Sequence, residues 1–276
     1  MDLVPLDFCE RVAAAWKCCD DGRFGCRCGK PVLATRNWAF PKATNAAFLI
    51  EPNLSGEWVY NFYLGSGVDM TMSELLEHPD FKNLRIVFIQ IYGNYAADTM
   101  KPVSDVGMEK LLNFVSFLAN EPRVSITSRN TSGFSSPEGA LLLSWLEQRW
   151  FSEIEFGIYK NPTNIFLGFV IGDKQFFGNQ LRSGQMTRLQ ANRSVFSSDF
   201  SSDVMEGIAQ SFLRSPSEKK VEISANFVDS TEGHLMEMEE GGLCARVDGK
   251  FIFENPFHRL QVSSSDASVW KCVTVK

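Results

Sequence analysis

Four cysteines near the N-terminus are the residues whose chemistry and spacing best suit a metal ion. Cys18, Cys19, Cys26 and Cys28 could place four thiolates around one zinc ion. Their Cys-Cys and Cys-x-Cys spacings differ from the usual pair, in which a turn of two to four residues directs both sulfur atoms to the metal. Reactive or redox-sensing thiols are a second interpretation. We favour the third, in which these are reduced cysteines in a loop and no metal or other cofactor is bound.

The three histidines stand far apart in the sequence, at His78, His234 and His258. No two of them have the three- or four-residue spacing that directs two imidazoles to one metal ion. Each could pair with Cys28 or Cys244 as base and nucleophile, but seven cysteines and three histidines allow such pairs in any chain. We therefore expect surface histidines and no catalytic residue.

Two further short stretches resemble ligand-binding motifs only in part. The Gly65-Ser-Gly67 stretch lacks the third glycine and the following helix of a phosphate-binding loop. The acidic stretch Glu232–Glu240 lacks the alternating ligands of a calcium loop, so we expect a solvated loop there. The sequence therefore predicts that the protein is not an enzyme.

A helix followed almost at once by a strand is the unit around which the chain is organised. In residues 135–156, Ser135 and Glu138 have the spacing of a capping box and Pro137 suits a first helical turn. The helical stripe and the following strand are predicted from Leu141, Leu142, Trp145, Leu146, Ile154, Phe156 and Ile158.

The same order of helix and strand returns four times. The apolar pairs that open the strands begin at positions 84, 124, 154, 189 and 221, which are 40, 30, 35 and 32 residues apart. A step of roughly 30 residues is typical of an α/β solenoid of leucine-rich-repeat type, although an ordinary α/β sheet is an alternative. Both interpretations predict a mostly parallel sheet, because each strand is reached through a helix.

Antiparallel strands are expected at both ends of this repeat region. Residues 46–50 and 58–64 predict a hairpin, in which Trp58, Tyr60 and Phe62 share one face. These aromatic residues could stack on a base or a peptide, but we expect them in the core. Asp248-Gly249 predicts a two-residue turn that begins a C-terminal meander.

One apolar run, residues 165–171, does not fit the repeat, and we expect an extra strand or a buried loop there. The long apolar strand over residues 84–92 is our candidate for the centre of the sheet, since strands covered on both faces are apolar throughout.

Composition limits the function. The chain has 276 residues, 44% of them hydrophobic, and a net charge of −6, which argues against binding to nucleic-acid phosphates. The N-terminal stretch has acidic residues where a secretory signal has basic ones, and no apolar run approaches the roughly 20 residues that span a bilayer. We expect an intracellular protein, cytoplasmic or nuclear, that does not bind membranes and whose cysteines are thiols.

The N-terminus predicts a short helix that begins near Pro5 and ends at Trp16. The stretch MDLVPLDFCERV resembles the start of a group of nematode proteins with degenerate F-box-like N-termini and F-box-associated C-terminal regions, and WLEQRWFSEIEF and FLRSPSEKKVEIS have the same order of helix and strand. The resemblance implies binding to a ubiquitin-ligase adaptor through Val4, Pro5, Leu6 and Phe8. Packing of this helix on the body, as a cap, is the alternative.

The expected organisation is a helix over residues 1–17, a cysteine-rich loop and hairpin over 18–70, repeats over 71–228 and a meander over 229–276, in one compact unit. The expected function is protein-protein interaction, by resemblance substrate recognition of F-box-associated type. Two alternatives are an enzyme with its site in loops at the strand ends and a structural or host-defence protein without an F-box role.

Overall fold

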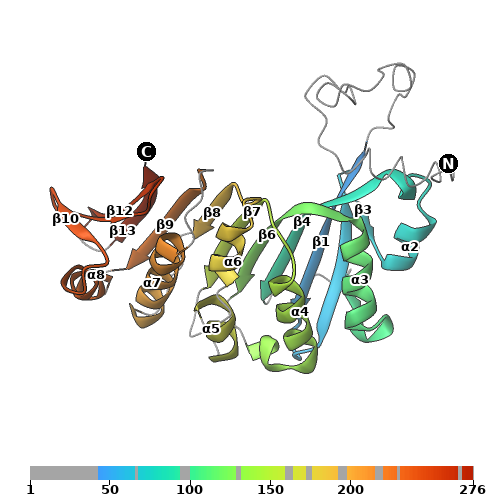
Figure 1. Ribbon diagram of the computed structural model, residues 1–276. Coiled ribbons are helices and arrows are strands. Elements are labelled where there is room, and N and C mark those ends of the chain that lie inside the picture. Colours follow the sequence, from blue (N-terminus) through green and yellow to red (C-terminus); the bar gives the residue numbers. More distant parts are fainter. Residues whose placement is uncertain are drawn as a thin grey trace, which may run out of the picture. The chain divides into compact units, whose positions relative to one another are not determined.

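The computed structural model describes residues 43–65, 68–93, 100–128, 132–158, 164–171, 176–191, 198–214, 220–228, 231–266 and 269–275. The chain divides into two compact units, residues 1–44 and 45–276, and nearly all described residues belong to the second. Within the second unit, the hairpin, the helix-strand repeats and the C-terminal strands share one mixed sheet, with helices packed against it (Figure 1). The expected mixed α/β fold is confirmed.

The strands follow one another across the sheet in the order β10-β11-β12-β13-β9-β8-β7-β6-β4-β1-β2-β3, and β5 also pairs with β2. Their bounds are β1 Thr44–Pro52, β2 Trp58–Leu64, β3 Val68–Met70, β4 Leu84–Gly93, β5 Lys101–Pro102, β6 Ala119–Ser128, β7 Glu153–Ile158, β8 Arg188–Ala191, β9 Glu222–Val228, β10 Ala245–Val247, β11 Lys250–Glu254, β12 Arg259–Asp266 and β13 Val269–Val275. The α-helices are α2 Met72–Glu77, α3 Met108–Leu118, α4 Pro137–Glu147, α5 Asn164–Ile171, α6 Phe176–Arg182, α7 Ser198–Arg214 and α8 Thr231–Glu240. Short 3-10 helices are η2 Phe81–Asn83, η3 Val103–Asp105 and η4 Ser132–Ser135.

The five strands predicted from the repeat lie side by side in sequence order. Strands β4, β6, β7, β8 and β9 pair in parallel, and Val124, Ile154, Leu189 and Ile223 stand in one row across four of them. Antiparallel strands flank this parallel group, with β1, β2, β3 and β5 on one side and β10 to β13 on the other. The sheet is therefore mixed, and its parallel part is the repeat region.

The helices of the repeat region lie on one side of the sheet. Neighbouring helices α3 and α4, α5 and α6, α6 and α7, and α7 and α8 contact one another, which places them in one layer (Figure 1). Right-handed crossovers that always step in the same direction put every helix on the same face. The side chains of the row from Val124 to Ile223 are buried on this face.

The starts of α2 and α4 are capped by side chains. At α2, the Thr71 hydroxyl accepts a hydrogen bond from the Glu74 amide at 3.2 Å and the Glu74 carboxylate accepts one from the Thr71 amide at 2.7 Å, which together form a capping box. The bond from the Thr71 amide lowers the pKa of Glu74. At α4 the predicted box is wrong, because the N-cap is Ser136 and Pro137 is the first helical residue.

Ser136 also joins α4 to the N-terminal hairpin. Its hydroxyl accepts from the Gly139 amide and from the Trp58 indole, both at 3.0 Å, and donates to the Gly133 carbonyl at 2.9 Å. The first turn of α4 lies directly on η4, so closely that a Cβ atom on Gly139 would be 2.5 Å from the Phe134 Cα. The start of α4 is therefore closely packed against η4 and is hydrogen-bonded to the N-terminal hairpin.

Phenylalanine dominates the core between the sheet and the helices. Phe62 is fully buried, with its ring centre 5.2 Å from that of Phe48 and 5.6 Å from that of Phe114. Trp58 and Tyr60 are buried beside it, so the core interpretation of this aromatic face is confirmed. Burial raises the pKa of Tyr60.

The apolar run at residues 165–171 forms helix α5, and the expected extra strand or buried loop is wrong. The helix contributes Phe166, whose ring centre is 4.9 Å from that of Phe134 and 5.9 Å from that of Phe156. A run in which nearly every residue is apolar suits a helix that is buried among other helices.

The C-terminal strands form the expected antiparallel meander, from β10 to β13, and β13 pairs antiparallel with β9. Asp248 and Gly249 have φ angles of 50° and 74°, as the predicted turn requires. The acidic stretch before it is helix α8, so the expected loop is wrong. Within the described residues, no helix is long and apolar enough to cross a membrane.

Candidate functional site

The face of the sheet that points away from the helices carries a line of charged side chains; we call it the open face. One row crosses its parallel strands, because the register aligns Phe88, Arg123, Glu153, Arg188 and Glu222 on β4, β6, β7, β8 and β9. We call this set the charge row. On β6, β7, β8 and β9, each member of the charge row directly precedes a member of the buried row from Val124 to Ile223. Successive side chains of a strand point to opposite faces, so the charge row points away from the helices.

The charge row alternates in sign. Arg123 Nε lies 2.9 Å from a Glu153 carboxylate oxygen, and the Arg123 guanidinium lies 5.9 Å from the centre of the Phe88 ring. Arg188 Nε lies 3.9 Å from a Glu222 carboxylate oxygen, which is too far for a hydrogen bond, and this Nε has no other hydrogen-bond partner among the described residues. The Arg123 pair is therefore formed, while the Arg188 pair is loose.

A second row on the same face lies two residues further along each strand, and all of its side chains are polar. It consists of Gln90, Ser125, Glu155, Gln190 and Ser224. No described helix lies over this row, in which Ser125 is buried and the other four side chains are partly exposed. The open face therefore combines polar groups with charges. Such a surface suits a protein partner, since interfaces combine polar groups with isolated aromatic residues such as Phe88.

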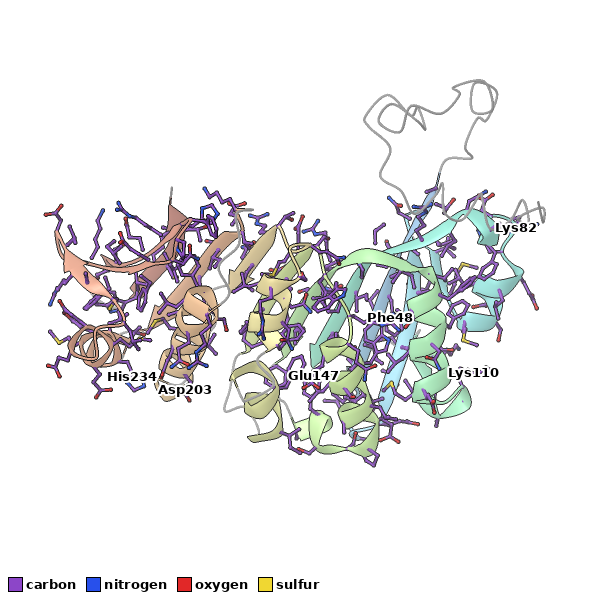
Figure 2. All side chains as sticks on the ribbon, viewed as in Figure 1. Phe48, Lys82, Lys110, Glu147, Asp203 and His234 are labelled. Atoms are coloured by element: carbon purple, nitrogen blue, oxygen red, sulfur yellow. The ribbon has the colours of Figure 1, made fainter. Side chains whose placement is uncertain are left out.

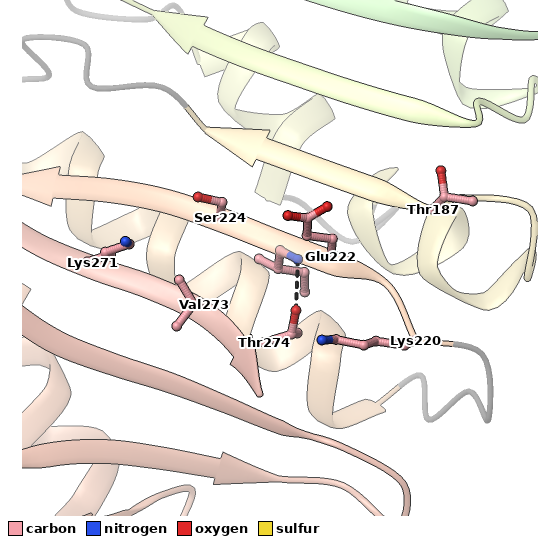
Figure 3. A pocket seen from close by; sticks show the side chains of 8 residues that line it. Thr187, Lys220, Glu222, Ser224, Lys271, Val273 and Thr274 are labelled. Carbon is pink, nitrogen blue, oxygen red and sulfur yellow. Dashed lines mark hydrogen bonds between the residues drawn. The ribbon is translucent and has the colours of Figure 1, made fainter. Parts of the chain in front are cut away.

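A hollow of about 460 Å³ lies on the same side of the sheet, where the parallel strands give way to the antiparallel ones (Figure 3). Its cause is a local separation of β9 from β13. The Thr274 hydroxyl accepts from the Ile223 amide at 3.0 Å and donates to the Val221 carbonyl at 2.9 Å, and so replaces backbone pairing beyond Val273 and Ser224. The hollow is lined by Thr187, Lys220, Glu222, Ile223, Ser224, Lys271, Val273 and Thr274.

Two lysines border this hollow from different strands. Lys220 precedes β9 and Lys271 lies on β13, and both side chains are exposed. Neither forms an ion pair with another described residue. Figure 3 shows them on either side of Ser224 and Val273.

Charge is unevenly distributed over the molecule. Among the side chains that the structure describes on the open face from β6 across to β11, six are basic and four are acidic, which is a surplus of two positive charges, although the whole chain has a net charge of −6. The ten residues are Arg123, Arg188, Lys220, Lys250, Arg259 and Lys271 with Glu153, Glu155, Glu222 and Glu254. The Arg259 Nε pairs with Glu254 at 2.6 Å, so the lysines account for the surplus.

The residues singled out first from the sequence lie elsewhere. Val4, Pro5, Leu6 and Phe8 and the cluster Cys18, Cys19, Cys26 and Cys28 are outside the described residues. No group of three potential metal ligands occurs in the part of the chain that the structure describes. The loops after the carboxyl ends of β4, β6, β7, β8 and β9, where the alternative enzyme site was expected, also fall outside the described residues.

The histidines are on separate elements. His78 ends α2 and its Nδ1 accepts from the Asp80 amide at 3.2 Å, His234 lies on α8 with Nδ1 3.3 Å from Glu237, and His258 precedes β12. Burial raises the pKa of Cys244 to about 11 and that of Cys272 to about 12, so both thiols are protonated at neutral pH and are poor nucleophiles.

The sequence does contain a signal for the charge row, although it cannot be seen from any one residue alone. In four of the five repeats a charged residue immediately precedes the buried apolar one, as in Arg123-Val124, Glu153-Ile154, Arg188-Leu189 and Glu222-Ile223. Their signs alternate from one repeat to the next, and parallel pairing makes them neighbours.

Comparison with known proteins adds no relative to this description. No protein-family model matches the sequence, and searches of curated proteins and of solved structures find no match.

Proposed function

We propose that the protein is a non-enzymatic, intracellular protein-interaction module that binds another protein on its open face. The observation that supports this most strongly is the charge row, which brings one side chain from each of five consecutive strands into a single line. A partner that touches this line contacts residues spread over 135 positions of sequence, from Phe88 to Glu222 (222 − 88 + 1). Specificity then comes from the alternation of charge, which disfavours partners with like charges in register.

We further infer that the repeat region is a curved solenoid of leucine-rich-repeat type. Its strands follow in sequence order and its helices lie on one side, which is the arrangement of a solenoid and differs from sheets wound on both faces. Helices are wider than strands, so helices on one side alone favour a sheet that is concave on the other. A concave sheet would enlarge the area that a partner can touch.

The open face is tested by removing its formed ion pair. We expect the double variant Arg123→Ala/Glu153→Ala to capture its protein partners from cell extract about tenfold less well than the wild-type chain, as quantified by mass spectrometry. Arg123 is exposed and Glu153 is partly exposed, so the pair contributes about 0–1 kcal/mol to folding and the variant should fold normally.

A matched control is the pair Arg246 and Glu232, whose charged atoms are 3.7 Å apart. It joins β10 to α8 and lies off the charge row. Arg246→Ala/Glu232→Ala removes the same two residue types and leaves the net charge unchanged. Equal loss of the same partners from both double variants, or no loss from either, would contradict binding on the open face.

By resemblance, the module is a substrate-recognition protein of F-box-associated type that docks to a ubiquitin-ligase adaptor through its N-terminus. We expect a pull-down with purified adaptor to retain the wild-type chain, and the triple variant Val4→Ala/Pro5→Ala/Phe8→Ala to reduce retention at least about tenfold, because the apolar contacts are lost. Failure of the wild-type chain to bind the adaptor would remove the F-box part of the proposal and leave the open face untouched. The double variant Arg123→Ala/Glu153→Ala serves as the control that should still bind the adaptor.

A further inference from the structure

We propose that the hollow between β8, β9 and β13 receives an acidic side chain from an extended, acidic segment of the partner protein. This inference rests on the proposed function, because it names the part of the open face that an acidic segment would occupy and the chemistry of that segment. The inference goes beyond the proposed function because it names Lys220, Lys271 and Ser224 as the residues that bind the acidic side chain.

The hollow is a consequence of the pairing of strands. Backbone pairing between β9 and β13 ends at Val273 and Ser224, and from there the Thr274 hydroxyl holds the two strands together. Because that hydroxyl is already engaged with both an amide and a carbonyl, it is not available to a ligand. Thr187 is engaged too, since its hydroxyl donates to the Ser152 carbonyl at 2.9 Å.

The groups that remain around the hollow are suited to a carboxylate. Two lysine ammonium groups without a described ion pair and one serine hydroxyl are all donors, and they come from two adjacent strands. Glu222 lies at the rim beside the unsatisfied Arg188 Nε, from which it is 3.9 Å away. A carboxylate that enters the hollow would therefore meet two lysines that no described carboxylate neutralises. Glu222 is the acidic side chain in the lining, and its nearest described cation is Arg188.

The charge surplus extends beyond the hollow and favours a segment over a single ion. Towards β11 the open face adds Lys250. Towards β6, Arg123 and Arg188 stand beside Glu153 and Glu222 and add no surplus. The surplus of two positive charges among the described side chains of this face contrasts with the net charge of −6 of the whole chain. A partner segment with several Asp or Glu residues is therefore attracted to the lysines of this face.

The test uses the full chain and a fluorescent twelve-residue peptide of alternating Glu and Ala, followed by fluorescence anisotropy. We expect saturable binding that weakens as salt rises from 50 to 300 mM, because screening shortens the range of these interactions. The double variant Lys220→Glu/Lys271→Glu should bind the peptide at least about tenfold less tightly than the wild-type chain. Circular dichroism spectra and thermal unfolding should be unchanged, because both side chains are exposed.

The control reverses two exposed lysines that lie outside the sheet, Lys82 on η2 and Lys110 on α3, which are labelled in Figure 2. Lys82→Glu/Lys110→Glu changes the net charge by the same amount and should retain wild-type peptide affinity. Equal weakening in the control would mean that binding follows net charge alone, and this would overturn the assignment to the hollow. Binding of a single-stranded oligonucleotide as tightly as the peptide would overturn it as well.

The proposal for the hollow and the proposal that partners bind the open face can be contradicted separately. If Arg123→Ala/Glu153→Ala reduces capture of protein partners but the wild-type chain does not bind the acidic peptide, the hollow assignment is wrong and the proposed function stands. If the peptide binds through Lys220 and Lys271 but capture does not depend on the charge row, the hollow is an acidic-peptide site and the wider docking surface is wrong.

Discussion

Replacing Gly139 with alanine is expected to lower the free energy of unfolding by about 4 kcal/mol or more, which would leave much of the protein unfolded at 37 °C. The added Cβ would overlap the backbone of η4, at 2.5 Å from the Phe134 Cα and 2.8 Å from its carbonyl carbon, and it would also overlap the Gly133 carbonyl oxygen. Backbone atoms cannot rotate away as a flexible side chain does. Relief would require α4 to move off η4, which would break the bonds that Ser136 makes.

Gly168 provides the matched control, because it is also a glycine in a helix, α5, but has open space where its Cβ would lie. Gly168→Ala should be neutral or should stabilise the protein by about 0.5–1 kcal/mol, since alanine loses less conformational entropy in a helix. Urea denaturation followed by circular dichroism measures both variants. A Gly139→Ala midpoint that equals the wild-type value would show that α4 and η4 do not pack as closely as described.

Truncation of Phe62 to alanine is expected to destabilise the protein by about 3–5 kcal/mol. The Phe62 ring is fully buried at the contact between the hairpin and α3, where it packs on Phe48, Tyr60 and Phe114. The variant would lose the burial of the ring and would leave a cavity that three aromatic neighbours can fill only in part. Urea denaturation followed by circular dichroism measures the loss.

The neighbouring residue Tyr63 supplies the control for this variant. Tyr63 is on the same strand, is of similar size and points to the other side of the sheet, with 43% of its surface exposed. Tyr63→Ala should cost less than about 1 kcal/mol. Equal effects of the two substitutions would mean that β2 does not present Phe62 to the core, and the register of the hairpin would then be wrong by one residue.

The parallel part of the fold could be predicted from the sequence because each strand has the same local signature. An apolar pair separated by one polar residue lies in or directly before each of the five parallel strands, and a helix with an apolar stripe precedes most of them. The turn at Asp248 and Gly249 was predictable for a similar reason, since its backbone angles depend on these two residues alone.

The elements that were missed lack a local signature. Helix α5 is apolar nearly throughout, so its sequence has no polar face from which a helical period could be recognised. Helix α8 is polar along most of its length, and Thr231, Leu235 and Met238 are its buried residues. A sequence with so few apolar positions has the composition of a loop. At α4 two adjacent serines compete for the cap, and the packing of Trp58 on Ser136 decides between them.

The candidate site depends on distant pairing and could be anticipated only in part. The alternating charges before each buried residue are visible in the sequence, but the row that they form exists only once β4, β6, β7, β8 and β9 are neighbours. The hollow has no sequence signal, because it arises where β9 separates from β13 and Thr274 replaces a backbone bond.

The order of the parallel strands also bears on how the chain acquires its structure. Each of these strands pairs with the one before it and the one after it, so contacts form between segments that emerge from the ribosome one after another. A growing chain can therefore assemble one unit upon the previous one before its C-terminal part has been synthesised. Until β13 covers it, β9 would present unpaired backbone groups, and nascent chains that stall at this point are those most exposed to chaperones and to aggregation.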